Sequence, residues 1–210
     1  FIESPGLAAL MGEHGVGQAF CTLIYRPSDT ACVFVSLYRA DRNAIELWRY
    51  DVATGDRTEL SVRGTNALGG EASPDGRHLY YAVRSGPAFA DDVTLPLWSI
   101  ERRDLANGRT DPVVKNICSA MRPEVSPDGR LLAYAVRQDG QTGLRLRDLA
   151  SGADRMLVLP IQRVAQESVS TRDLLPGYSF TPDGTAIVLT RGGRFERVPV
   201  QGGAPQPIPF

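Results

Sequence analysis

The chain has 210 residues, a formal net charge of −1 and 42% hydrophobic residues, which is enough apolar material for a sizeable core. The near-zero charge argues against nucleic-acid binding, since phosphates require a basic surface, and the sequence lacks the run of about 18 apolar residues that a membrane span needs. The opening residues Phe1–Gly6 resemble the interior of a polypeptide, so we expect the chain to be a fragment of a longer protein.

A four-residue turn motif recurs along the chain. It occurs in a degenerate form at Pro27–Thr30 and then as Ser73–Gly76, Ser126–Gly129 and Thr181–Gly184, with spacings of 46, 53 and 55 residues between successive aspartates. Proline fixes φ at the first corner, aspartate can bond the local backbone and glycine accepts a positive φ, so the motif predicts a tight turn. A repeat of this length is typical of a β-propeller, in which each repeat forms one blade.

Residues that favour strands flank each turn. A nearly continuous apolar run follows the turn, as in Leu131–Val136, and predicts a strand that is buried on both faces. Apolar and polar residues then alternate, as in Leu144–Leu149, and a small-residue–glycine pair predicts a hairpin to a short outer strand. Each repeat therefore predicts a four-stranded antiparallel meander. The short segment Gly6–Met11 is the one place where the sequence leaves a helix as an alternative.

These repeats predict an all-β fold, a β-propeller or partial propeller with about four visible four-stranded antiparallel blades. We expect residues 1–210 to form one propeller domain. Its blades are predicted at about residues 20–62, 68–116, 121–160 and 177–210.

The paired motifs of the third repeat, Arg122–Tyr134 and Asp148–Gly152, resemble the TolB-like (WD40-like) β-propeller repeat, and the resemblance extends over about residues 26–210. Two later stretches, Thr171–Gly184 and Gly192–Val198, resemble the N-terminal propeller of amidohydrolase-family proteins. This resemblance implies a metal-dependent amidohydrolase domain elsewhere in the full polypeptide. Zinc or another divalent metal is expected only in that domain, and no cofactor is expected in this chain.

No motif in the chain predicts a complete catalytic site. His14 and His78 are far apart in the sequence and lack the short spacings that bring metal ligands together, and no G-x-S-x-G nucleophile motif occurs. We expect Asp75, Asp128 and Asp183 to cap turns rather than bind a metal, because every blade needs such a cap whatever its function. The prediction is therefore that the chain contains no catalytic, cofactor-binding or metal-binding residue.

The connection between Pro160 and Gly177 is longer than a link between blades requires, and long connections of this kind are usually functional or disordered. We predict that it contacts a neighbouring domain, and a solvated loop is the alternative. The connection from Ser85 to Pro96 is a second insertion with the same two interpretations. The predicted interdomain contact residues are Arg163, Gln166, Glu167, Arg172, Asp173, Leu174 and Leu175.

The leading functional hypothesis is a non-catalytic propeller that packs on and gates an amidohydrolase domain, an amide- or peptide-bond hydrolase, lying outside this chain. Two alternatives remain: a stand-alone periplasmic TolB-like protein-interaction propeller, and the propeller cap of a prolyl-oligopeptidase-like serine peptidase. The expected partner is the catalytic domain of the same polypeptide or another copy of the chain. The resemblance implies a periplasmic or secreted location, with a cytoplasmic one still open.

Overall fold

The computed structural model describes residues 24–26, 29–39, 42–51, 53–62, 64–85, 98–115, 119–161 and 177–209. These residues form sixteen strands joined by turns and irregular segments, and no helix occurs among them. The all-β prediction is confirmed. Within the same residues, no helix is long and apolar enough to cross a membrane.

The strands form four antiparallel sheets, each with four strands in chain order. The first sheet contains β1 (Ile24–Arg26), β2 (Asp29–Arg39), β3 (Ala44–Asp51) and β4 (Arg57–Glu59). The second contains β5 (Thr65–Ala72), β6 (His78–Ser85), β7 (Ser99–Asp104) and β8 (Thr110–Val114). The third contains β9 (Met121–Val125), β10 (Leu131–Gln138), β11 (Gln141–Asp148) and β12 (Asp154–Val158). The fourth contains β13 (Tyr178–Phe180), β14 (Ala186–Arg191), β15 (Arg194–Pro199) and β16 (Gln206–Ile208).

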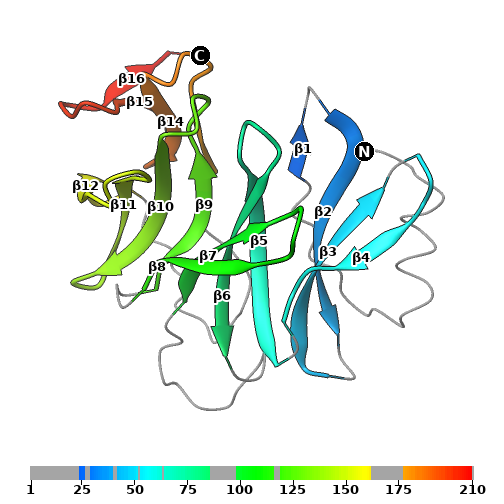
Figure 1. The fold of residues 1–210 in the computed structure, drawn as a ribbon. Helices are drawn as coiled ribbons and strands as arrows, with labels where there is room; N and C mark the ends of the chain where they lie inside the picture. Colours follow the sequence, from blue (N-terminus) through cyan, green and yellow to red (C-terminus); the bar gives the residue numbers. More distant parts are fainter. Residues whose placement is uncertain are drawn as a thin grey trace.

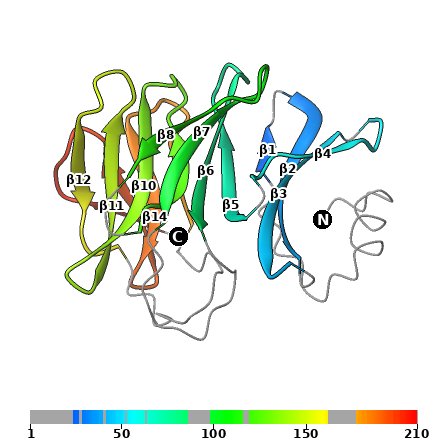
Figure 2. The ribbon, with the colours of Figure 1, turned by 60° about the horizontal axis from the view of Figure 1, so that its bottom comes forward.

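The sheets follow one another across the molecule, with β1–β4 at one side and β13–β16 at the other (Figure 1). The second sheet lies between the first and the third in both ribbon views (Figures 1 and 2). We call each sheet a blade. The second sheet begins with β5 at Thr65, slightly before residue 68, where the sequence predicted the second blade to begin.

Apolar side chains fill the spaces between successive blades. Phe34, Leu47 and Leu60 of the first blade pack with apolar residues of the second, and Ile100 and Val114 of the second pack with those of the third. The third and fourth blades share the largest such cluster. The core is therefore a series of layers between sheets, and each layer belongs to two blades.

Strand β10 shows why an apolar run without alternation forms a strand in this fold. Leu132 and Tyr134 pack toward the second blade, whereas Ala133 and Ala135 pack toward the fourth. All four side chains are at most 1% exposed. Since successive side chains of a strand point to opposite faces, a strand between two neighbours must be apolar on both faces. The prediction of a doubly buried strand is confirmed here.

Candidate functional site

The meander order gives every blade two unlike ends. The turn between its first and second strands and the hairpin between its third and fourth strands lie at one end, which we call the turn end. The connection between the second and third strands and the link to the next blade lie at the other, which we call the link end.

The turn motifs form hydrogen-bonded caps at the turn end. The Ser126 hydroxyl donates to an Asp128 oxygen at 2.6 Å and accepts the Leu131 N–H at 2.8 Å, and the same Asp128 oxygen accepts the Arg130 N–H at 3.1 Å. The Ser126 hydroxyl and then the Arg130 N–H hold the pKa of Asp128 below its usual value. Ser73 with Asp75 and Thr181 with Asp183 repeat this arrangement, so the turn-capping interpretation of these aspartates is confirmed.

The hairpins at the same end are capped by a second set of aspartates. One oxygen of Asp148 accepts the N–H groups of Ala150 and Ser151 at 3.1 and 2.8 Å, and these bonds lower the pKa of Asp148. Asp51 and Asp104 accept the corresponding N–H groups in their own blades. The aspartates of the turn motifs and of these hairpins are thus acceptors that hold the backbone in shape.

Adjacent turns also contact one another between blades. A Cβ placed on Gly129 would lie 3.7 Å from Cδ of Pro74, and one on Gly184 would lie 3.6 Å from Cδ of Pro127. Each proline therefore rests against the glycine of the following turn. Gly129 has φ 73°, a backbone conformation that glycine adopts without the steric cost of a side chain.

Both long connections predicted from the sequence begin and end at the link end. Residues 86–97 lie between β6 and β7, and residues 162–176 lie between β12 and β13. The predicted contact residues Arg163, Gln166, Glu167, Arg172, Asp173, Leu174 and Leu175 all lie outside the described residues. Their proposed role therefore stays a prediction, although the strand ends that flank them place the attachment points at one end of the blades.

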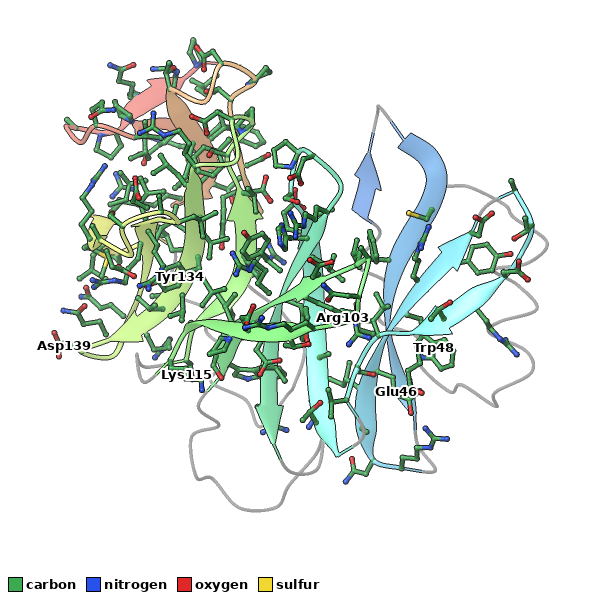
Figure 3. The ribbon with its side chains drawn as sticks, viewed as in Figure 1. Glu46, Trp48, Arg103, Lys115, Tyr134 and Asp139 are labelled. Carbon is green, nitrogen blue, oxygen red and sulfur yellow. The ribbon has the colours of Figure 1, made fainter. Side chains whose placement is uncertain are left out.

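Polar and aromatic side chains gather at the described part of the link end. In β3, the buried carboxylate of Glu46 accepts Arg42 Nη1 at 2.6 Å and Trp48 Nε1 at 3.1 Å, and Figure 3 shows Glu46 and Trp48 close together. The Arg84 guanidinium lies 5.3 Å from the centroid of the Trp98 ring, a cation–π contact beside the attachment points of residues 86–97. Burial lowers the pKa of Arg84.

The inner strands carry a second polar group that the sequence analysis missed. The Ser179 hydroxyl of β13 donates to Glu124 Oε1 of β9 at 2.7 Å, and the Tyr178 hydroxyl donates to the Arg122 carbonyl. Burial raises the pKa of Glu124, and the Ser179 bond opposes that shift. Aligning the repeats on their turns would have revealed the position, because Glu71, Glu124 and Ser179 each stand two residues before a turn motif.

Arg122 occupies an unusual backbone conformation at this place. Its φ is 49°, and it lies beside an irregularity in the β9–β10 register that matches the one at Gly69 between β5 and β6. A β-bulge of this kind increases the local twist of an inner strand and redirects the neighbouring side chains. At this position of positive φ the second blade has Gly69, whereas the third blade has Arg122. The carbonyl of Arg122 also accepts the hydrogen bond from the Tyr178 hydroxyl.

The described residues contain no group of three His, Cys, Asp or Glu side chains that could hold a metal ion. His78 begins β6, where its carbonyl accepts the Ser73 N–H at 2.8 Å and its own N–H donates to the Ser73 hydroxyl at 2.9 Å. It therefore serves the turn through its backbone. The polar groups described above position the backbone of the turns and join strands of neighbouring blades.

No protein-family model and no curated protein matches the sequence. Comparison with solved structures gives TolB from Acinetobacter baumannii, with a TM-score of 0.59 and 17% identity over 97% of this chain and 45% of that one. A putative TolB from Agrobacterium tumefaciens gives a TM-score of 0.61 and 16% identity over 91% of this chain and 67% of that one.

The chain has a β-propeller fold. A puromycin-hydrolyzing peptidase of Mycobacterium tuberculosis is also similar, with a TM-score of 0.60 and 18% identity over 92% of this chain and 31% of that one. At these identities the likeness concerns the fold. The chain spans about 45% of the length of the Acinetobacter TolB that it matches.

Proposed function

We propose that this chain is a non-catalytic propeller domain that packs on a hydrolase domain of the same polypeptide and gates access to its active site. The observation that carries the proposal is the division between the two ends of the blades. At the turn end, the aspartates of the turn motifs and of the hairpins accept hydrogen bonds from the backbone, whereas both long connections attach at the link end. A recognition role therefore falls to the link end.

The proposed hydrolase is a metal-dependent amidohydrolase that cleaves amide or peptide bonds. Sequence resemblance over Thr171–Gly184 and Gly192–Val198 supports this class. The proposed metal, zinc or another divalent ion, belongs to that domain, and the proposed location is periplasmic or secreted. In this arrangement the propeller restricts which substrates reach the metal, while the chemistry takes place outside the chain.

A peptidase cap is the second candidate, and one comparison favours it. The matched part of the Mycobacterium tuberculosis peptidase is 31% of that chain, so a propeller-like portion there belongs to a much larger enzyme. A stand-alone TolB-like interaction propeller is the third candidate, supported by the two TolB structures. The gene sequence beyond Phe210 separates them: an H-x-H after a strand supports the amidohydrolase, a G-x-S-x-G the peptidase, and a stop codon the stand-alone module.

The docking role of residues 162–176 is tested by the double variant Leu174→Ala/Leu175→Ala in the full-length protein. If these leucines anchor the catalytic domain, truncation should weaken domain association or activity by roughly 2–4 kcal/mol, the size of an interface hot spot. The melting temperature of the propeller should change less. Activity and thermal unfolding are the two measurements.

The charge variants Arg172→Ala and Asp173→Ala provide matched controls on the same segment. Charges at an interface rim contribute more to specificity than to affinity, so each should cost little in folding. If the double leucine variant unfolds the propeller while activity per folded molecule is unchanged, the leucines belong to the propeller core and the docking role is wrong.

A further inference from the structure

The hairpin between β7 and β8 contains the one asparagine of the sequence that a glycine follows, at Asn107–Gly108. The Asn107 side chain is exposed, and its Oδ1 atom accepts the Arg109 N–H at 2.8 Å. This bond holds the side-chain amide against the backbone of its own turn. Because glycine has no Cβ, the amide carbon can approach the Gly108 nitrogen without a side chain in the way.

The corresponding hairpins of the first and third blades have a hydroxyl at this position. The hydroxyls of Thr54 and Ser151 each accept the N–H of the residue two positions further on, at 3.2 Å in both hairpins. A hydroxyl oxygen satisfies the same N–H as the Asn107 amide does, but it offers no carbonyl carbon that a backbone nitrogen can attack. The second blade is therefore the one of these three in which the shared turn carries a reactive amide.

The aspartates of the turn motifs also precede glycine, but their charge protects them from the same attack. An aspartate cyclises through its neutral acid form, because a carboxylate is a poor electrophile. Hydrogen bonds from serine or threonine hydroxyls, and then from backbone N–H groups, lower the pKa of Asp75, Asp128 and Asp183. These side chains therefore stay charged near neutral pH, whereas the amide of Asn107 is neutral.

We propose that Asn107 is a site of spontaneous covalent modification, at which the Gly108 nitrogen attacks the side-chain amide carbon. A bond forms between the Gly108 nitrogen and Asn107 Cγ, the bond from Cγ to Nδ2 breaks, and ammonia leaves with the proton of the Gly108 N–H. Water then opens the resulting succinimide at either carbonyl and gives aspartate or isoaspartate. Nothing is oxidised or reduced, and the reaction adds a negative charge at the turn end of the second blade. This inference is independent of the proposed hydrolase.

The cap of the hairpin controls how often the attacking nitrogen is available. The Gly108 N–H donates to the Asp104 carbonyl at 2.8 Å. The carboxylate of the same aspartate accepts the N–H groups of Ala106 and Asn107 at 2.9 and 3.3 Å. Attack requires local opening of these bonds, so the rate depends on the fraction of molecules in which the hairpin is open. Asp104 is therefore a positioning residue that slows the reaction.

The first test follows Asn107 in the full-length protein by peptide mass spectrometry during incubation near neutral pH. Asn66 is the internal reference, because it is 0% exposed and precedes an alanine. Asn107 should convert at least ~10-fold faster than Asn66, because an exposed hairpin opens far more often than a buried strand. The product should contain isoaspartate as well as aspartate, since direct hydrolysis of the amide gives aspartate alone. Equal rates at the two asparagines, or a product without isoaspartate, would overturn the proposal.

The second test compares the cap variant Asp104→Ala with Asp148→Ala, which removes the corresponding acceptor from the hairpin of the third blade. Conversion of Asn107 should become roughly 3- to 10-fold faster in Asp104→Ala and stay unchanged in Asp148→Ala, because only the first variant weakens the hairpin that contains the site. Asp104→Asn retains a side-chain oxygen and should restore most of the slow rate.

Circular dichroism establishes that each of these variants is folded. An unchanged rate in Asp104→Ala, or equal acceleration in Asp104→Ala and Asp148→Ala, overturns the role of the cap. If a variant does not fold, the first test still decides the proposal, because it uses the protein without any substitution.

Discussion

Asp183 accepts three hydrogen bonds at one carboxylate oxygen. The Thr181 hydroxyl donates at 2.5 Å, the Thr185 N–H at 3.0 Å and the Thr185 hydroxyl at 2.9 Å. These bonds stabilise the charged form and lower the pKa of Asp183 from 3.8 to about 2. The residue therefore couples the stability of the fourth blade to pH.

The sign of this coupling gives a prediction for Asp183→Asn. Because the folded-state pKa is below the unfolded one, the contribution to stability is fully present above about pH 4 and is lost as the pH falls through about 2. The melting temperature of the wild type should exceed that of Asp183→Asn at pH 6, and the difference should shrink between pH 4 and pH 2. Thermal unfolding across this range measures it. A difference that stays constant down to pH 2 contradicts the assignment.

Ser126 provides a second prediction for a single residue. It is 1% exposed, and its hydroxyl satisfies both Asp128 and the Leu131 N–H. In Ser126→Ala that N–H and the carboxylate lose a buried partner, so the free energy of unfolding should fall by about 1–3 kcal/mol. Ser99→Ala is the control, because among the described residues the Ser99 hydroxyl makes one long bond, of 3.4 Å to the Val83 carbonyl. Denaturant unfolding of the two variants compares them, and equal losses would contradict the capping role.

At the scale of the element, the connection between the third and fourth blades depends on a few polar contacts besides the apolar core. The Tyr178 hydroxyl bonds the Arg122 carbonyl, and an Arg155 nitrogen donates to the Val200 carbonyl. The first bond joins strands of two sheets, and the second joins β12 to the residue that follows β15. The fourth blade covers only one neighbour among the described residues, so these contacts hold the end of the series in place.

We predict that Tyr178→Phe loosens the fourth blade selectively. The loss of one intramolecular hydrogen bond should cost about 1 kcal/mol, expressed as local opening of β13–β16. Tyr81→Phe is the matched control, because the Tyr81 hydroxyl bonds Glu101 within its own blade at 3.1 Å. Hydrogen exchange should become faster in the fourth blade for Tyr178→Phe, and in the second blade for Tyr81→Phe. Faster exchange throughout the chain in the first variant would contradict a local role.

Particular elements show how far sequence reasoning reaches in this fold. The Pro-Asp-Gly turns and the doubly apolar strand Leu131–Val136 follow from local chemistry, so the sequence predicts them and the structure contains them. The bond between Ser179 and Glu124 joins residues of different blades, and its geometry depends on the angle between two sheets. Local sequence patterns carry no information on the angle between two sheets. The predicted contacts of residues 162–176 also join parts of the protein that are distant in sequence, so they stay a prediction.

At the scale of the whole molecule, the fourth blade packs against one neighbouring sheet among the described residues, the third. Propellers typically contain four to eight blades, and terminal repeats need a covered apolar face to remain soluble. We predict that residues 1–210, expressed alone, associate with increasing concentration, and that Phe195→Lys reduces this association. Sedimentation velocity of the two proteins makes the comparison, with Val62→Lys as the control. A wild-type chain that stays a monodisperse monomer would contradict the prediction.

The division between the turn end and the link end also determines where this scaffold tolerates new sequence. The two residues Asp139 and Gly140 join β10 to β11 at the link end, the place where the second blade accommodates residues 86–97. The contacts between Pro74 and Gly129 and between Pro127 and Gly184, which align neighbouring blades, lie at the opposite end. A foreign peptide grafted between Gln138 and Gln141 would therefore be displayed without disturbing the joints between blades, and the same freedom lets related proteins diverge in what they recognise while the architecture stays constant.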